Sequence, residues 1–242
     1  MGKVVVITGA GSGLGRAMAR RLAREGHQLV LLGRSLAKVE AVAEEIGGGA
    51  FALSCDVGAV ESVRSAFAAI AEREPRIDVL INNAAVYEPF MIDEGSDEQI
   101  AQALDTNLAG TIHVTRAALA QMGEGSHVIN ISTRTVAEPA VMLALYQTSK
   151  AGLERFTKTL REEVAERGIR VSMLRAAGMM EEGMTMNMSP EVFARFREER
   201  AKRKIGYNAV SQFASVADML PWLIDLPADV AVTELMLEAR AT

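Results

Sequence analysis

Hydrophobic residues along the chain fall into two repeating kinds of segment. Short continuous runs such as Val4 to Ile7 and Leu29 to Leu32 are typical of strands that are buried on both faces of a sheet. Between these two runs, Leu14, Met18 and Leu22 recur at the spacing of a helix with one apolar face. The first part of the chain is therefore predicted to form a strand, a helix and a second strand.

The same alternation continues through the rest of the chain. Further strands are predicted at Phe51 to Leu53, Val79 to Ile81, Val128 to Ile131, Arg170 to Leu174 and Val230 to Leu235. Helices are predicted from about Ala37 to Ile46, Ala59 to Ala71, Ile100 to Met122, Tyr146 to Glu166 and Val216 to Ile224. Repeated β–α alternation indicates parallel strands covered by helices on both faces. The pattern predicts the α/β fold class and a single doubly wound Rossmann domain over residues 1–242.

Two stretches interrupt the alternation, residues 84–98 and residues 176–210. Both follow strands, and in an open parallel sheet ligands bind beyond the carboxyl ends of the strands. The second stretch is rich in methionine, with Met179, Met180, Met184, Met186 and Met188. Such a segment is suited to covering an apolar substrate, and ordinary hydrophobic packing is the alternative. Its basic run from Arg195 to Lys204 is interleaved with Glu198 and Glu199, which favours a solvated helix face.

Composition narrows the range of partners. The net charge of -5 argues against a nucleic-acid footprint and against recruitment to anionic membranes. The single cysteine, Cys55, excludes an internal disulfide and is expected to be a small buried hydrophobe. The run from Val4 to Ile7 is too short for a secretory signal, and no apolar stretch approaches the ~20 residues of a membrane span. We therefore expect a soluble, cytoplasmic protein with a small-molecule partner.

A glycine-rich turn follows the first predicted strand directly, in the sequence Thr8 to Gly15. Gly9, Gly13 and Gly15 give this turn its spacing, although the literal pattern G-x-G-x-x-G is not met. Glycines between a buried strand and a helix let the backbone approach a pyrophosphate, which then lies at the positive end of the helix. The turn predicts phosphate binding.

The end of the second strand distinguishes between the two nicotinamide dinucleotides. An acidic residue there would accept from the adenosine 2′-hydroxyl, whereas an arginine accommodates a 2′-phosphate. This chain has Arg34 and Ser35 at that place and no acid. Arg34 can pair with a phosphate through two hydrogen bonds. The sequence favours NADP(H) over NAD(H), and a surface arginine at a helix start is the alternative.

Six short motifs occur in order along the chain. They are Thr8 to Gly15, Asp56-Val57, Asn82-Asn83-Ala84, Asn107 within Asp105-Thr106-Asn107, Asn130-Ile131-Ser132-Thr133, and Tyr146 to Lys150. Each is weak alone, but with their order and spacing the chain resembles the short-chain dehydrogenases/reductases over nearly its whole length. The resemblance implies an oxidoreductase that acts on a carbonyl or an alcohol with a nicotinamide cofactor.

The chemistry of the last motif can also be argued directly. Tyr146 and Lys150 are four residues apart, so both project from one helix face. A free tyrosine has a pKa near ~10, and a nearby ammonium favours the phenolate and brings the group toward the working range of a general acid or base. An exposed helix pair is the alternative.

The resemblance assigns roles to the remaining positions. Tyr146 donates a proton to the carbonyl oxygen, Thr133 donates a hydrogen bond to that oxygen, and Lys150 holds the nicotinamide ribose. Asn107 holds a water that links the lysine to solvent. The catalytic residues implied are Asn107, Thr133, Tyr146 and Lys150. The cofactor-binding residues implied are Gly9, Ser12, Gly13, Leu14, Gly15, Arg34, Ser35, Asp56, Val57, Asn83, Ala84, Tyr146, Lys150 and Gly178.

The family resemblance also implies a homodimer or homotetramer, formed through the two long helices that follow the fourth and fifth strands. The C-terminal sequence Val232-Thr233-Glu234-Leu235 resembles members that are often NADP-dependent reductases of small or acyl carbonyls. The three histidines His27, His113 and His127 lack metal-ligand spacing, so no metal is expected.

Several positions depart from the family pattern. Threonine replaces serine at Thr133, and Ala85 replaces a glycine after the fourth strand. The usual Pro-Gly after the sixth strand reads Ala177-Gly178, and the threonine that commonly follows is Glu182. Because successive residues of a strand point to opposite faces, only one of Ser132 and Thr133 can address the substrate. We assign Thr133 and expect Ser132 to support the cofactor side of the strand end.

These observations predict an NADP(H)-dependent oxidoreductase that interconverts a carbonyl and an alcohol on a moderately apolar small molecule. A cofactor-binding sensor or scaffold without turnover is the main alternative. It is disfavoured because a pure binding module does not need the pair of Tyr146 and Lys150. A cofactor-independent lyase or dehalogenase is disfavoured by the complete glycine turn.

Overall fold

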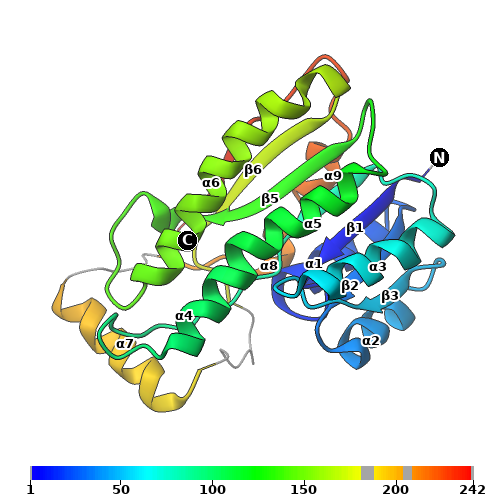
Figure 1. Ribbon diagram of the computed structural model, residues 1–242. Coiled ribbons are helices and arrows are strands. Elements are labelled where there is room, and N and C mark those ends of the chain that lie inside the picture. The colour runs from blue at the N-terminus through cyan, green and yellow to red at the C-terminus, as the bar shows by residue number, and fades with distance from the viewer. Residues whose placement is uncertain (1, 181–187, 204–208, 241–242) are drawn as a thin grey trace.

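The computed structural model describes residues 2–180, 188–203 and 209–240. Within these residues, seven parallel strands form one sheet in the order β3-β2-β1-β4-β5-β6-β7 (Figure 1). The strands are β1 (Val4–Thr8), β2 (Gln28–Gly33), β3 (Phe51–Ser54), β4 (Val79–Asn82), β5 (His127–Thr133), β6 (Arg170–Ala176) and β7 (Glu234–Leu237). The chain runs outward from β1 to β3 and then resumes at β4 on the other side of β1. The direction of winding therefore reverses between β1 and β4, where open sheets of this kind bind ligands.

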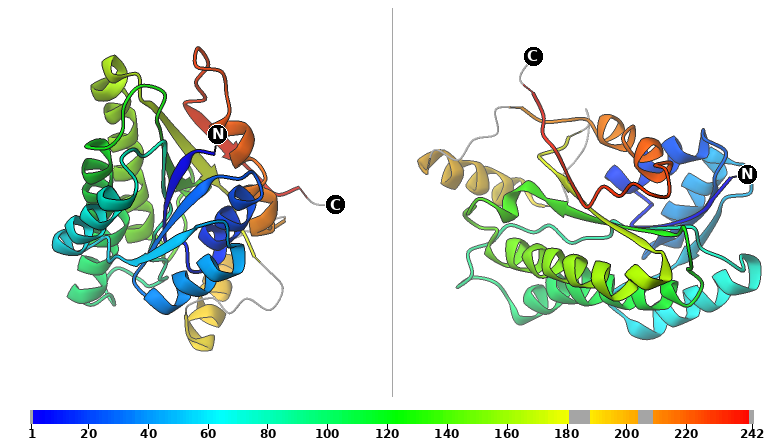
Figure 2. Two further views of the ribbon diagram at one scale, coloured as in Figure 1. Left: turned by 90° about the vertical axis from the view of Figure 1, so that its right-hand side faces the viewer. Right: turned by 90° about the horizontal axis from the view of Figure 1, so that it is seen from above.

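Helices cover both faces of this sheet (Figure 2). They are α1 (Gly13–Ala23), α2 (Leu36–Ile46), α3 (Val60–Arg73), α4 (Asp97–Leu104), α5 (Gly110–Leu119), α6 (Ala144–Val164), α7 (Pro190–Lys202), α8 (Phe213–Ala217) and α9 (Leu220–Ile224). Three single turns accompany them: η1 (Asp105–Ala109), η2 (Arg134–Val136) and η3 (Ala165–Arg167). Along the described residues no helix is both long and apolar enough to cross a membrane.

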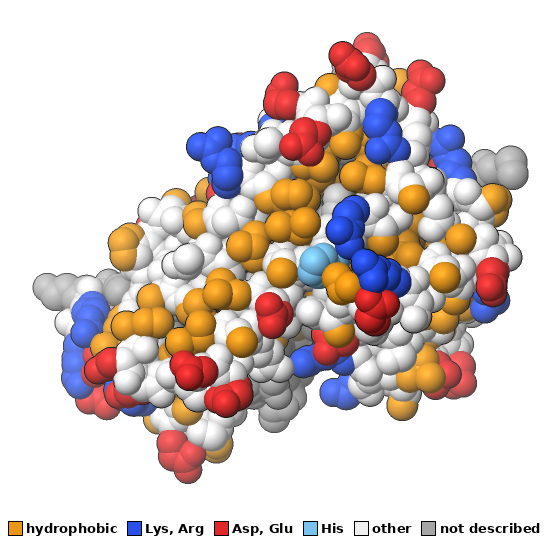
Figure 3. Space-filling view, viewed as in Figure 1, with side chains coloured by type: hydrophobic (Ala, Val, Ile, Leu, Met, Phe, Trp, Pro, Cys, Tyr) orange, Lys and Arg blue, Asp and Glu red, His pale blue; other side chains and the backbone are white. Residues whose placement is uncertain are grey.

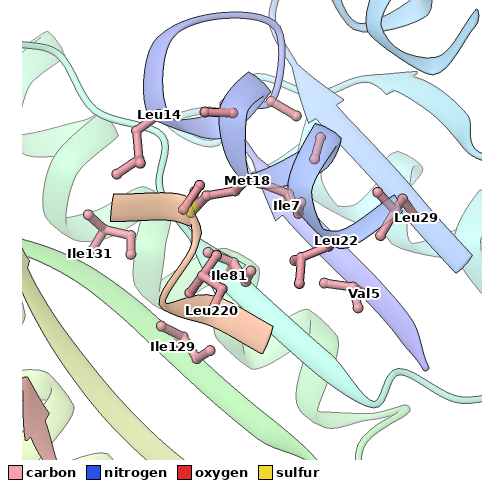
Figure 4. Close-up of a cluster of buried hydrophobic side chains, with 14 of the residues drawn as sticks. Val5, Ile7, Leu14, Met18, Leu22, Leu29, Ile81, Ile129, Ile131 and Leu220 are labelled. Atoms are coloured by element: carbon pink, nitrogen blue, oxygen red, sulfur yellow. The ribbon is translucent and has the colours of Figure 1, made fainter. Parts of the chain in front are cut away.

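Two hydrophobic layers hold the helices to the sheet. In β1, Val5 and Ile7 face the layer that also contains residues of α1, α2, α8 and α9, whereas Val6 faces the layer of α3, α5 and α6. This alternation follows from the two-residue period of a strand. Figure 4 shows Met18 and Leu22 of α1 over the strand residues of the first layer. The continuous apolar runs in the sequence are therefore explained by burial on both faces.

Four predicted elements differ in detail from the structure. The single helix expected over residues 100–122 is α4 and α5, joined by a π-helical turn at η1 that contains Asn107. The helix expected over residues 216–224 is the two short helices α8 and α9, and Pro221 lies in the first turn of α9, where a proline fits. The last strand begins at Glu234, because its pairing with β6 starts at Met173.

The fourth difference lies in the stretch 176–210, which contains the helix α7 (Figure 1). Most of the charged residues of the basic run that the structure describes are exposed, among them Arg195, Arg197 and Lys202, so the expected solvated helix face is confirmed. Phe196 and Arg200 of the same helix are buried. Met184, Met186, Glu182 and Lys204 lie outside the described residues.

Candidate active site

The turn between β1 and α1 depends on its glycines. Gly9 and Gly13 have φ values of 66° and 50°, in the left-handed region that favours glycine. A Cβ on Gly15 would lie 2.2 Å from the carbonyl oxygen of Gly9, so no larger residue fits there. In α1 the amide of Arg16 donates to the carbonyl of Ser12 at 3.1 Å. The helix amides that precede Arg16 are therefore donors for an anion at this helix end.

A cavity of about 340 Å³ opens in front of this turn. It extends over the carboxyl ends of β1, β2, β3 and β4. Its lining is Gly9, Gly11, Ser12, Gly33, Arg34, Ser35, Lys38, Val39, Cys55, Asp56, Val57, Asn83, Ala84, Ala85 and Thr106. The volume is of the size that ligand sites have, and the glycine cradle fits the pyrophosphate of a dinucleotide.

Side chains at the far end of this cavity carry positive charge. Arg34 and Ser35 follow β2, as the sequence suggested, and Lys38 lies in the first turn of α2, which begins after Ser35. A Cβ on Gly11 would lie 3.0 Å from the Cβ of Lys38, so the lysine stem packs against the glycine turn. Lys38 was not among the predicted residues, because its place at the cavity depends on the packing of α2 against the glycine turn.

We call the carboxyl ends of β1 to β4, which border the cavity, the nucleotide end. The other predicted residues there are fixed by backbone contacts. The amides of Asn83 and Ala84 both donate to Thr8 Oγ1, at 2.9 and 3.0 Å, which joins the end of β4 to the end of β1. Asp56 Oδ1 accepts from the amide of Gly58 at 3.0 Å and thereby shapes the turn after β3. Cys55 is buried as expected, and burial raises the pKa of its thiol to about 11.

Tyr146 and Lys150 lie one turn apart on α6, as predicted. Lys150 is buried, with 3% of its surface exposed, and its Nζ donates to the carbonyl oxygen of Ile131 at 2.8 Å. Burial lowers the pKa of this lysine to about 8. Its ammonium is therefore held at the end of β5, close to the helix face that carries Tyr146.

Asn107 ties three segments together inside the fold. Its Oδ1 accepts from the amide of Val86 at 2.7 Å, and its Nδ2 donates to the Val86 carbonyl and to Ser149 Oγ at 3.0 and 3.1 Å. The loop after β4 is thereby joined to α6 at the residue before Lys150. The π-helical turn η1 carries Asn107, and turns of this kind often occur at functional sites.

Thr133 is the last residue of β5 and is buried. Its Oγ1 accepts from the amide of Thr135 at 3.2 Å and lies 3.2 Å from Thr135 Oγ1. Ser132 points toward α6 instead, and its hydroxyl donates to Glu154 Oε1 at 2.7 Å. The expectation that Ser132 supports the cofactor side was therefore wrong, because the strand alternation directs this side chain into the interface with α6.

An aromatic group lies beside Tyr146. The ring of Tyr87 meets that of Tyr146 edge to face, with centroids 4.9 Å apart, and meets Phe196 of α7 at 6.4 Å. Buried Met142 and Leu143 complete this hydrophobic cluster. Tyr87 and Phe196 were not among the predicted residues, since only the fold brings the loop after β4 and α7 to α6.

A glutamine in α6 braces the segment that links β5 to this cluster. Gln147 Nε2 donates to the carbonyls of Thr135 and Glu138, the latter at 2.6 Å, and its Oε1 accepts from the amide of Ala140 at 3.1 Å. Met142, at the end of this segment, has a φ of 62°, which is uncommon for a residue with a side chain. The side chain next to Tyr146 in the sequence therefore fixes the loop beside the candidate site.

The predicted residues do not all line one cavity. Within the described part of the chain, the cavity is bordered by Gly9, Ser12, Arg34, Ser35, Asp56, Val57, Asn83 and Ala84 of the predicted set. Thr133, Tyr146 and Lys150 lie at the ends of β5 and α6, next in strand order to β4. Gly178 follows β6, where its carbonyl accepts from the amide of Ser211. Among the described residues no group of metal-binding side chains gathers.

Comparisons with known proteins agree with this arrangement. A family model described as short chain dehydrogenase matches residues 3–193. The chain is 32% identical over 229 residues to carbonyl reductase family member 4 of Danio rerio, covering 94% of this chain and 93% of that protein. It is 29% identical to a human 3-oxoacyl-[acyl-carrier-protein] reductase, with the same coverage of both chains.

A solved structure extends the comparison to three dimensions. A short chain dehydrogenase from Burkholderia cenocepacia in complex with NADP superposes with a TM-score of 0.84 at 26% identity, covering 98% of this chain and 97% of that one. The match spans both the nucleotide end of the sheet and the α6 side. The chain therefore belongs to the short-chain dehydrogenase/reductase family of oxidoreductases.

Proposed function

We propose that this protein uses NADP(H) to interconvert a carbonyl and an alcohol on a moderately apolar small molecule, with Tyr146 as the general acid and base. The observation that carries the proposal is the α6 face. Tyr146 lies one turn from a buried lysine whose ammonium is fixed to the end of β5. A module that only binds a nucleotide has no need for this pair.

The bound nicotinamide would supply or accept the hydride. In the reductive direction Tyr146 gives its proton to the substrate oxygen, and the nearby ammonium of Lys150 stabilises the phenolate that remains. Thr133 donates a hydrogen bond to the same oxygen as negative charge develops there. Lys150 would also hold the nicotinamide ribose. Asn107 keeps the loop after β4 and α6 together while these groups act.

The preference for NADP(H) over NAD(H) is proposed from the side chains that follow β2. Arg34, Ser35 and Lys38 all border the nucleotide cavity there, and together they supply two cations and a hydroxyl donor. A guanidinium pairs with a phosphate through two hydrogen bonds, and the lysine adds a second point charge. The Burkholderia cenocepacia structure is an NADP complex, which supports the same preference.

Substrate class is proposed from the apolar cluster beside Tyr146. Tyr87, Met142 and Phe196 form a hydrophobic cluster with Tyr146, and the guanidinium of Arg200 lies over the ring of Phe196 at 5.3 Å. The names of the carbonyl and 3-oxoacyl reductases to which the chain is similar support a carbonyl substrate. In this proposal α7, within the stretch 176–210, covers the substrate.

We also propose that the chain acts as one catalytic unit over residues 1–242 and forms a homo-oligomer through α5 and α6. Figure 3 shows hydrophobic side chains gathered over these two helices, and Ile112 of α5 is exposed. Light scattering of the protein and of Ile112→Glu tests this: the variant should be smaller than the wild type. Equal masses for the two proteins contradict the proposed interface.

The decisive experiment for function is turnover. The purified protein is mixed with NADPH, and separately with NADH, and a panel of aliphatic, aromatic and 3-oxoacyl carbonyls is screened by loss of absorbance at the reduced nicotinamide band. We expect turnover with NADPH and a lower kcat/KM with NADH. Tight NADPH binding without turnover of any carbonyl or alcohol contradicts the proposal and supports a sensor or scaffold.

A further inference from the structure

A largely buried polar cluster joins α6 to the sheet just below the end of β5. It consists of Ser132, Glu154 and Arg175, and we call it the strut. Glu154 Oε1 accepts from Ser132 Oγ and from Arg175 Nε, both at 2.7 Å. Glu154 Oε2 accepts from Arg175 Nη2 at 2.7 Å. Both carboxylate oxygens are thus bound by a two-pronged guanidinium, an arrangement that fixes orientation as well as distance.

Glu154 continues the functional stripe of α6. Tyr146, Lys150 and Glu154 are spaced four residues apart, so they follow one another along one helix face. Lys150 binds the carbonyl of Ile131, and Glu154 binds the side chain of the next residue, Ser132. The residue after that is Thr133. Two successive turns of α6 are therefore fastened to the two residues that precede the proposed substrate hydroxyl.

The position of Arg175 follows from strand register. Arg175 pairs with Ser132 across β5 and β6, so both side chains emerge side by side on the face covered by α6. Its Nη1 reaches outward to Glu234 of β7 at 2.8 Å. The hydrogen bonds that Arg175 donates to Glu154 and Glu234 raise the pKa of Arg175.

Stability alone is a weak reason for such a pair. Glu154 is 7% exposed, and replacing a buried ion pair by apolar side chains of similar volume is often neutral or stabilising. A bidentate pair does, however, restrict sliding of a helix over a strand. Here, sliding of α6 would change the distances between the residues of α6 and the end of β5.

We propose that Glu154 and Arg175 are positioning residues, which set the register of α6 against the end of β5 so that Thr133 and Tyr146 meet the same substrate oxygen. This inference rests on the proposed function, in which those two residues touch the substrate. Glu154 acts through Ser132 on the strand and through its own helix on Tyr146. Neither Glu154 nor Arg175 contacts the substrate.

The kinetic test compares Arg175→Met and Ser132→Ala with the control Glu234→Gln, which removes the charge of the outer partner of Arg175 and its ion pair with Lys158. Rates are normalised to molecules that bind NADPH, so unfolded protein does not count. We expect kcat of Arg175→Met to fall about tenfold to a hundredfold, because a displacement near 1 Å has effects of that size. The NADPH Kd should change less than about twofold. Glu154→Gln, which keeps an acceptor oxygen for Ser132, should lose less than Arg175→Met.

A second readout distinguishes positioning from simple support of the fold. With NADPH deuterated at the transferred position, the isotope effect on kcat should rise in Arg175→Met and Ser132→Ala, because the chemical step becomes slower. It should stay at the wild-type value in Glu234→Gln. An unchanged kcat and isotope effect in both strut variants, whatever their melting temperatures, overturns the inference.

Crystal structures make the test independent of turnover. In ligand-free Arg175→Met the distance between Thr133 Oγ1 and Tyr146 Oη should differ from the wild type by about 0.5 Å or more, the tolerance of a productive site. An unchanged distance overturns the inference. If the wild type turns over no carbonyl, the proposed function fails while this distance still decides the role of the strut. If Arg175→Met does not fold, the same distance in Ser132→Ala decides.

Discussion

The ends of β1 to β4 and the ends of β5 and β6 lie side by side in one sheet, yet they are built differently. The nucleotide end is a backbone structure: glycines with left-handed φ values, helix amides and the amides of Asn83 and Ala84. The α6 side is a side-chain structure, in which Lys150, Glu154 and Asn107 reach across to other segments. A backbone cradle tolerates many sequences around its glycines, whereas a side-chain network depends on the identity and register of each member.

This contrast predicts that substitutions on the two sides affect different quantities. Apart from Lys150, which is proposed to hold the nicotinamide ribose, changes on the α6 side should alter turnover and leave nucleotide affinity nearly intact. Changes at the end of β2 should alter the choice of nucleotide and leave the chemical step intact.

Tyr146→Phe should give the largest effect. Removing the phenolic proton donor is expected to lower kcat by roughly 10²- to 10⁴-fold, the usual contribution of a general acid or base. NADPH affinity, measured by calorimetry, should stay near the wild-type value. Tyr87→Phe is the matched control, because it removes a phenol at the neighbouring ring and should lower kcat only slightly. Near-normal turnover by Tyr146→Phe contradicts the role assigned to Tyr146.

Lys150 should make the stability of the fold depend on pH. Burial lowers its pKa from 10.5 to about 8, so the unfolded chain binds more protons between those values. The free energy of unfolding should therefore rise with pH from about 8 to about 10.5, and the lysine contributes on the order of 3 kcal/mol to this rise. Lys150→Met should show a flatter pH dependence in denaturant titrations. The same variant should also weaken NADPH binding and turnover. If the free energy of unfolding depends on pH equally in both proteins, the pKa of Lys150 is not lowered in the folded protein.

Arg34→Ala tests the nucleotide end of the sheet. Hydrogen bonds to charged groups contribute about 1.5–3 kcal/mol, so NADPH should bind roughly tenfold to a hundredfold more weakly. NADH should be affected far less, and Lys38→Ala should show the same selectivity to a smaller degree. Equal losses for both nucleotides would place Arg34 away from the 2′-phosphate.

Thr133→Val keeps the shape of the side chain and removes its hydroxyl. We expect kcat/KM to fall by about tenfold or more, because a donor aimed at developing charge is stronger than a neutral hydrogen bond. Thr133→Ser should retain activity. If Ser132→Ala abolished turnover while Thr133→Val did not, Ser132 would be the substrate donor, and the contact with Glu154 would have to break on substrate binding.

Arg195→Ala should give the smallest effect. Arg195 of α7 binds both carboxylate oxygens of Glu94 at 2.7 Å, but both side chains are about half exposed. Exposed pairs contribute little, so we expect the KM of an apolar substrate to rise roughly two- to fivefold, with kcat and NADPH affinity unchanged. Phe196→Ala should raise the same KM further. An unchanged KM in both variants would remove α7 from the substrate site.

Local patterns were sufficient for much of this molecule. All seven strands and most helices were predicted, because each is marked by its own apolar period. The helix break at Asn107 was not predicted, since hydrophobic spacing continues through the π-helical turn. The boundary of β7 was misplaced because an edge strand is set by pairing with β6, and its own burial is slight.

The residues of the candidate site also fall into two groups, those set by local sequence and those set by long-range contacts. The glycine turn, Arg34 and the spacing of Tyr146 and Lys150 could be read from the sequence, because each depends on neighbours within one or two turns. Lys38 was overlooked, because only the packing of α2 against the glycine turn brings it to the cavity. Tyr87, Phe196 and the strut could not be found, because their contacts join residues that are far apart along the chain.

The sequence by itself determined the alternation of strands and helices, the phosphate-binding turn and the helix face that carries Tyr146 and Lys150. These features rest on periodicity, glycine conformation and i, i+4 spacing, all of which are local. Only the tertiary structure decided that Ser132 turns to Glu154, that Lys38 lies against Gly11 and that Tyr87 packs on Tyr146. Those outcomes depend on strand register and on how α6 and α7 pack, and packing is a property of the whole chain.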